Sequence, residues 1–145
     1  MNANVPGTYV LSYSASNLFQ TTTVTRQVIV ADTTPPLIDG FSLTPSMLGP
    51  PNQMMVDVAL SYTVTDASNA ASCTVSVASN EPVTGPGSGN TAGDWEVVNS
   101  HHVRLRAERS GAGTGRIYTV TLTCADPSGN TSTATATASV AHDRR

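Results

Sequence analysis

The sequence contains no lysine and few charged residues of any kind. Charged side chains make up 12% of its 145 residues, all seven basic side chains are arginine, and the formal net charge is −3. A chain this weakly charged lacks the basic track that binds polyanions. We therefore expect neither nucleic acid nor an anionic membrane surface among its partners.

Long apolar runs are also missing. No stretch of 18 consecutive apolar residues occurs, so the sequence predicts no insertion into a membrane. The opening residues MNANVPGTYV lack the basic start and the apolar block of a secretory signal. If the protein is exported, we expect this chain to be a mature product or a piece of a longer precursor.

The residue patterns that carry catalysis are absent as well. Despite many serines there is no GxSxG motif, and GPGSGN (85–90) has neither the lysine nor the following helix of a phosphate-binding loop. His101 and His102 are adjacent, so on a strand they point to opposite faces and cannot readily share a metal. We predict that the protein is not an enzyme.

What the sequence does contain is alternation of apolar and polar residues. In residues 56–65 and 117–125, Val, Leu, Ile or Tyr alternates with Thr, Ser or Asp, and the same rhythm appears in 73–79, 102–107 and 133–140. A period of two is typical of antiparallel strands with one solvated face. The chain therefore reads as all-β.

Seven strands fit between residues 36 and 142. We expect them at residues 37–44, 54–65, 72–79, 95–98, 102–108, 116–125 and 131–141. Their number and lengths predict an immunoglobulin-like (Ig-like) antiparallel β-sandwich.

The two cysteines lie at strand ends that such a sandwich brings together. Cys73 begins the third expected strand and Cys124 ends the sixth, both on the inward face, and these strands are antiparallel neighbours in an Ig-like fold. The arrangement predicts a cross-strand disulfide and hence an oxidising, extracellular or cell-surface location. The alternative is a pair of small buried thiols.

The first 32 residues repeat the end of the sandwich. YVLSYSASN (9–17) follows the rhythm of YTVTLTCAD (118–126), and a loop, a Thr-rich strand and an Asp follow in both cases. We interpret residues 1–34 as the last two strands of a preceding module with its joint, DTTPP, and residues 35–145 as a complete sandwich. Proline makes such a joint stiff without requiring a ladder hydrogen bond.

Two strands alone are marginally stable, so we expect something to hold them. The candidates are the rest of a cleaved domain, the neighbouring module, or another copy of the chain that donates strands. The residues available for pairing between chains are Tyr9, Leu11, Tyr13, Val28 and Val30. A fragment cut within a domain is the plainer alternative.

A family resemblance spans nearly the whole chain. PGTYVLSYSAS and VIVADTTPP look like the end of hyalin-repeat-like (HYR-like) and related bacterial Ig-like modules. SLTPSMLGPPNQMMVDVALSYTVTD, followed by SNEPV, DWE, LRAERSG, GRIYTVTLTCAD and SGNTSTATATASV, resembles a bacterial Ig-like repeat of large secreted and surface proteins. The chain departs from the family around PPN, where Gly49 replaces the usual Trp and Gln53-Met54 replaces His-Lys.

The resemblance implies a spacer, stalk or adhesion module of a secreted or surface protein. A second hypothesis is a subunit of an extracellular filament or surface layer, assembled by strand complementation between chains. A third is a carbohydrate-binding accessory domain of a secreted hydrolase, which an exposed Trp95, the sole tryptophan, beside Tyr or Arg side chains would favour.

Three acids are expected at the end of the sandwich where its first strand begins. Asp32 lies in the joint, Asp66 follows one strand, and Asp126 opens the loop DPSGN, which ends at Asn130. We expect these acids to converge with Asn130 and nearby carbonyls as metal ligands, and hard oxygen ligands of this kind suit Ca²⁺. The alternative is that Asp126 and Asn130 merely hydrogen-bond within their turn.

Arginines gather around the fifth and sixth strands. The set comprises Arg104, Arg106, Arg109 and Arg116, with Glu108 among them. They could contact an acidic glycan, or form a solvated face with ordinary Glu–Arg pairs.

Overall fold

The structure, a computed structural model, describes residues 2, 5–83 and 93–141. These residues form β-strands and no helix, so the described ranges hold no helix that could cross a membrane. The strands are β1 (Gly7–Ser16), β2 (Thr21–Val30), β3 (Leu37–Thr44), β4 (Met55–Thr65), β5 (Ser72–Ser79), β6 (Trp95–Asn99), β7 (His102–Arg106), β8 (Gly115–Ala125) and β9 (Thr131–Ala141).

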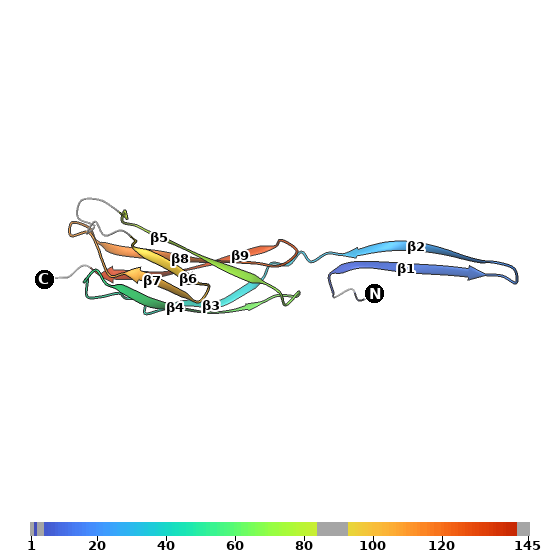
Figure 1. Ribbon diagram of the computed structural model, residues 1–145, viewed down its shortest axis with the longest axis horizontal. Helices are drawn as coiled ribbons and strands as arrows, with labels where there is room; N and C mark the ends of the chain where they lie inside the picture. The colour runs from blue at the N-terminus through green and yellow to red at the C-terminus, as the bar shows by residue number, and fades with distance from the viewer. Residues whose placement is uncertain (1, 3–4, 84–92, 142–145) are drawn as a thin grey trace.

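Seven of these strands form two facing antiparallel sheets, which confirms the all-β sandwich predicted from the alternation (Figure 1). One sheet has the order β3-β4-β7-β6 and the other β5-β8-β9. Strand boundaries differ from the expected ones by one residue or less, except that β7 ends at Arg106 instead of residue 108. There the backbone turns, because the N–H of Glu108 donates to the carbonyl of Arg106 at 2.9 Å.

The core lies between the sheets and consists of the inward positions of the alternating pattern. Its fully buried members include Val58, Val103, Leu105, Tyr118, Val120, Ala138 and Val140. Burying a Val or Leu side chain stabilises a fold by about 1.5–3 kcal/mol, so this interior supplies the main driving force for folding.

The segment after β3 links the two sheets. Past Thr44 the chain leaves β4 and runs parallel to β9, where the N–H of Leu48 donates to the Ser139 carbonyl at 2.8 Å. The N–H of Ser139 in turn donates to the Ser46 carbonyl at 2.9 Å. Residues 46–48 therefore cover part of the outer edge of β9.

β1 and β2 form a separate two-stranded sheet, and within the described residues each pairs only with the other. Their hairpin extends away from the sandwich along the long axis of the molecule (Figure 1). Like β8 and β9, it is an antiparallel pair joined by a short loop, and Tyr9 lies opposite Val28 as Tyr118 lies opposite Ala138. The two loops differ by one residue, with four between Ser16 and Thr21 and five between Ala125 and Thr131.

Candidate cation site at the joint

The joint, residues 31–36, meets the sandwich where two loops emerge. β3 begins at Leu37, which pairs with Thr65 at the end of β4, so the β4–β5 loop starts beside the joint. The β8–β9 loop starts at the same end, because Ala125 pairs with Ser72 at the start of β5. We call this the joint end of the sandwich.

The structure brings Asp32, Asp66 and Asp126 together at the joint end. Each offers a carboxylate oxygen, and these oxygens lie within 4.8 Å of one another. Asp32 comes from the joint, Asp66 from the β4–β5 loop and Asp126 from the β8–β9 loop. These are the three acids expected from the sequence, and the topology explains their convergence. Asn130, the fourth expected ligand, lies beside them with its amide nitrogen donating to the Asp32 carbonyl and to Asp126.

Each acid uses one oxygen to shape its own turn. Oδ1 of Asp32 accepts from the N–H of Thr34 at 3.0 Å, and Oδ1 of Asp66 accepts from the N–H of Ser68 at 2.9 Å and from the Ser68 hydroxyl. Oδ1 of Asp126 accepts from the N–H of Asn130 at 2.8 Å. Such turn bonds fix the three carboxylates, and in Asp32 and Asp66 they leave the second oxygen unused.

The second oxygens differ in their surroundings. Oδ2 of Asp32 and Oδ2 of Asp66 each expose less than 1 Å² and accept no hydrogen bond. Oδ2 of Asp126, by contrast, accepts from the side-chain amide of Asn130 at 2.7 Å. At the joint end, the buried Oδ2 atoms of Asp32 and Asp66 therefore have no donor among the described residues, which is costly unless a cation or a polar ligand contacts them.

Asn130 connects the loop to the joint. Its Nδ2 donates to the main-chain carbonyl of Asp32 at 3.1 Å as well as to Asp126. The turn bonds that served as the alternative to a metal site are thus present, but they leave the free oxygens of Asp32 and Asp66 unexplained. Asn130 positions two of the acids through its amide nitrogen.

Asp126 is ionised under ordinary conditions although it is only 7% exposed. Burial raises the pKa of this carboxyl, but hydrogen bonds from the Asn130 side chain and from the N–H groups of Asn130, Ser128 and Gly129 outweigh it, so the pKa lies below its usual value. Gly129 adopts φ of 90°, a left-handed conformation that favours glycine and lets its N–H turn inward.

The predicted disulfide lies directly beside this site. Cys73 and Cys124 are register partners on β5 and β8, with their Cα atoms 4.1 Å apart, and they are bonded. Cys124 precedes Asp126 by two residues and Cys73 closes the loop that carries Asp66. The bond therefore holds together the two strands from which the loops emerge.

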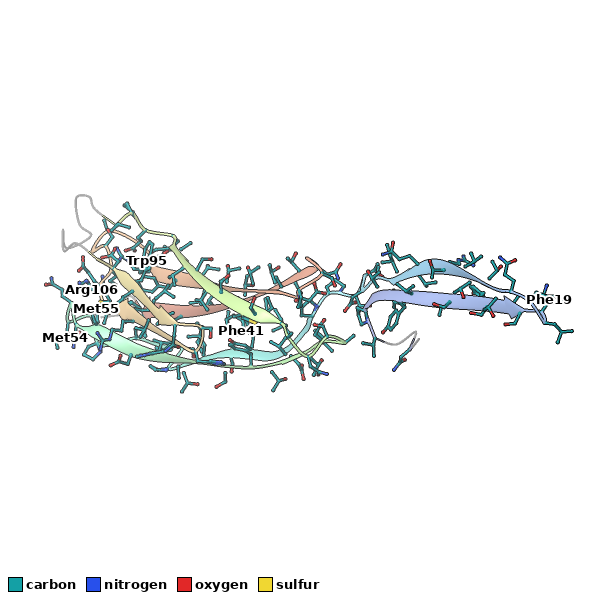
Figure 2. All side chains as sticks on the ribbon, turned by 45° about the vertical axis from the view of Figure 1, so that its right-hand side comes forward. Phe19, Phe41, Met54, Met55, Trp95 and Arg106 are labelled. Atoms are coloured by element: carbon teal, nitrogen blue, oxygen red, sulfur yellow. A yellow bond between two sulfur atoms is a disulfide. The ribbon has the colours of Figure 1, made fainter. Side chains whose placement is uncertain are left out.

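The hairpin residues suggested for pairing between chains share one face. Tyr9, Leu11, Tyr13, Val28 and Val30 are half-buried or exposed, and in the described part of the chain no other strand covers them. The sequence reasoning overlooked Arg26, which lies opposite Leu11 on the same face. Figure 2 shows Phe19 at the far tip, where it is 94% exposed.

The interpretation of the arginines as a solvated face is wrong for Arg116 and Glu108. Arg116 is fully buried, and its guanidinium donates to Asp94 at 2.5 Å, to Glu81 at 3.3 Å and to the Tyr118 hydroxyl at 3.1 Å. Glu108 is only 3% exposed. The alternating pattern could have predicted the burial of Arg116, because Arg116 lies two residues before the inward Tyr118 on the same strand. Its partners Glu81 and Asp94 could not be predicted in this way, because they lie in loops without an alternating pattern.

Arg104 does form ordinary surface ion pairs, with Asp57 at 3.0 Å and Glu96 at 3.4 Å.

Trp95 is half-buried and packs edge-to-face on Tyr118, with ring centroids 6.3 Å apart. It lies with Arg106 at the opposite end of the sandwich from the joint (Figure 2). The GPGSGN segment lies outside the described residues.

No protein-family model, curated protein or solved structure matches the chain. The geometry is therefore the basis for the functional proposals.

Proposed function

We propose that the chain is a non-enzymatic, extracellular Ig-like structural module that acts as a spacer or stalk and transmits tension along a longer assembly. The observation that carries this proposal is the path of the chain. It enters the sandwich at the joint end through β3 and leaves at the opposite end through β9 (Figure 1). Modules with this path can be strung end to end.

The strand order supports an Ig-like relationship. Sheets ordered β3-β4-β7-β6 and β5-β8-β9 correspond to the ABED and CFG sheets of a constant-type immunoglobulin domain. The hairpin resembles the final strand pair, because in both a Tyr lies opposite an aliphatic side chain, as expected of tandem modules. Its neighbours in that case are further Ig-like modules.

The disulfide is compatible with an extracellular protein. It closes a loop between residues 51 apart, which limits how far the chain extends if the module unfolds under load. A location outside the cell or at its surface fits this use.

Assembly by strand complementation is the second candidate, and the uncovered hairpin favours it. The apolar face carrying Tyr9, Tyr13 and Val24 is open, and the outer edge of β1 has no partner strand in the described residues. Any completing sheet, from another copy or another protein, must accommodate Arg26 on that face. Carbohydrate binding gains no such support, because Trp95 packs against Tyr118.

Sedimentation and small-angle X-ray scattering of the whole oxidised chain distinguish these functions. A spacer predicts an elongated monomer, with a radius of gyration well above the about 15 Å of a compact domain of 145 residues. Concentration-dependent, open-ended assembly would favour complementation. A compact monomer would contradict both.

A further inference from the structure

We propose that Asp32, Asp66 and Asp126 bind one Ca²⁺ ion at the joint end. The binding is inferred from the geometry of the site alone, and its role in stiffening the joint rests on the proposed spacer function. The ion would join one ligand from the joint to one from each of two sandwich loops.

The first argument is charge. Three carboxylates offer oxygens within 4.8 Å of one another, and in the described residues none of the three forms an ion pair with an arginine or histidine. Like charges this close repel each other unless a counter-charge lies among them. A divalent cation bound between them removes that repulsion.

The second argument is independent of charge. The Oδ2 atoms of Asp32 and Asp66 are shielded from solvent, each with under 1 Å² exposed, and no donor reaches them. Because buried acceptors are nearly always satisfied, a missing partner indicates a ligand. Both atoms belong to residues of the same cluster, which favours a ligand held by the three acids.

The ligand atoms of the three acids favour calcium over zinc and magnesium. All three side chains are oxygen donors, and the cluster contains no histidine or cysteine, which zinc sites usually use. Ca²⁺ accepts irregular shells of six to eight oxygens and can complete them with carbonyls and water, whereas Mg²⁺ requires near-ideal octahedral geometry. Three carboxylates from three separate segments suit Ca²⁺ better, and extracellular modules bind it with dissociation constants of roughly 10⁻⁴–10⁻³ M.

Asn130 is a positioning residue for this site. Its amide holds the Asp32 carbonyl at 3.1 Å and Oδ2 of Asp126 at 2.7 Å, so the joint acid already lies beside the loop acid. The disulfide between Cys73 and Cys124, which lies two residues before Asp126, fixes β5 against β8. The site is therefore largely organised before a cation binds.

The test is a titration of the whole oxidised chain with CaCl₂, and separately with MgCl₂, followed by amide NMR shifts. We expect saturable, one-to-one shifts confined to residues 31–34, 66–69 and 126–130, with a midpoint of roughly 0.1–1 mM for calcium and weaker binding of magnesium. Asp32→Asn and Asp66→Asn should each weaken calcium binding at least about tenfold, since each removes one charged ligand.

Asp39→Asn is the matched control, because Asp39 is an exposed acid on β3 outside the cluster. It changes the net charge equally and should leave the midpoint unchanged. Well-dispersed amide spectra establish that each variant is folded. The proposal is overturned if the folded wild type shows no saturable shifts up to about 10 mM calcium, ten times the weakest expected constant, or if Asp39→Asn weakens binding as much as Asp32→Asn.

These outcomes are separable from the spacer proposal. The shape of the chain in solution is measured without calcium, so an elongated monomer that ignores calcium would remove this site and leave the spacer intact.

Discussion

The side-chain amide of Asn130 donates a hydrogen bond to the main-chain carbonyl of Asp32, 98 residues earlier in the chain, at 3.1 Å. This bond joins the stretch that leads out of the hairpin to the β8–β9 loop of the sandwich. Besides the covalent chain itself, it is a direct link between the joint and the module that follows. The orientation of the hairpin therefore depends in part on this polar contact.

Asn130→Ala should loosen the joint without unfolding the sandwich. The lost bond to the Asp32 carbonyl is worth roughly 1 kcal/mol, which corresponds to about fivefold to tenfold faster amide exchange around residues 32–34. Hydrogen exchange followed by mass spectrometry measures this. Ser128→Ala, an exposed change in the same loop, should have no effect; equal acceleration in both variants would show that the contact is unimportant.

Asp126 should contribute acid sensitivity to the fold. The pKa of its carboxyl is lower in the folded state than the ordinary value of about 3.9, so its stabilisation is present above that value and is lost as the pH falls through the lower folded pKa. The free energy of unfolding of the wild type should therefore decrease below about pH 4. Asp126→Asn should flatten this decrease when urea unfolding is measured between pH 5 and pH 2.

Part of the acid sensitivity should survive in that variant. Asp57 also has a lowered pKa, because Arg104 and His102 hydrogen-bond to its carboxylate. An Asp126→Asn protein whose pH dependence equals that of the wild type would contradict the assigned role.

Reduction of the Cys73–Cys124 bond should destabilise the sandwich. A cross-link between residues 51 apart stabilises by about 4 kcal/mol on the loop-entropy model, since it restricts the unfolded chain. Urea unfolding with and without reductant measures the difference. A Cys73→Ser, Cys124→Ser variant should match the reduced wild type and no longer respond to reductant.

Arg116→Met should be among the most damaging substitutions. It removes the guanidinium that pairs with buried Asp94 and Glu81, and an uncompensated buried charge costs about 3–5 kcal/mol. The double variant Arg116→Met, Asp94→Asn should recover part of the loss, because one stranded carboxylate is then neutral. Arg104→Met, which removes surface pairs, serves as the control and should change the midpoint of urea unfolding little; an equal loss in both variants would refute the buried network.

The sequence was most informative where one face of a strand is buried. Val58, Leu60, Val120 and Leu122 repeat every second residue because a sheet has two faces, and the cysteines kept that phase, so both the sandwich and the disulfide could be predicted. Arg116 kept the same phase but was read as a surface residue. The charge of Arg116 suggested an exposed side chain, whereas in the structure the buried guanidinium is neutralised by Asp94.

The cation cluster was predictable only through topology. Once the strand order is known, Asp66 and Asp126 must emerge at the end where Asp32 arrives. The contact of Asn130 with the Asp32 carbonyl could not be predicted from an alternating pattern, because this contact depends on the conformation of the five-residue loop between β8 and β9. The same holds for Glu81 and Asp94, which lie outside regular strands.

The central claim is that the sandwich transmits tension between its two ends. Pulling on the ends loads the hydrogen bonds between residues 46–48 and Ser139 in shear, since the two segments run parallel. Single-molecule force extension of the whole chain therefore tests it most directly. We predict a resolved force peak with one step of extension, and reduction should lengthen that step by about 180 Å, from the sequence separation of 51 between Cys73 and Cys124. Gradual extension without a peak, or a step that reduction leaves unchanged, would contradict the account.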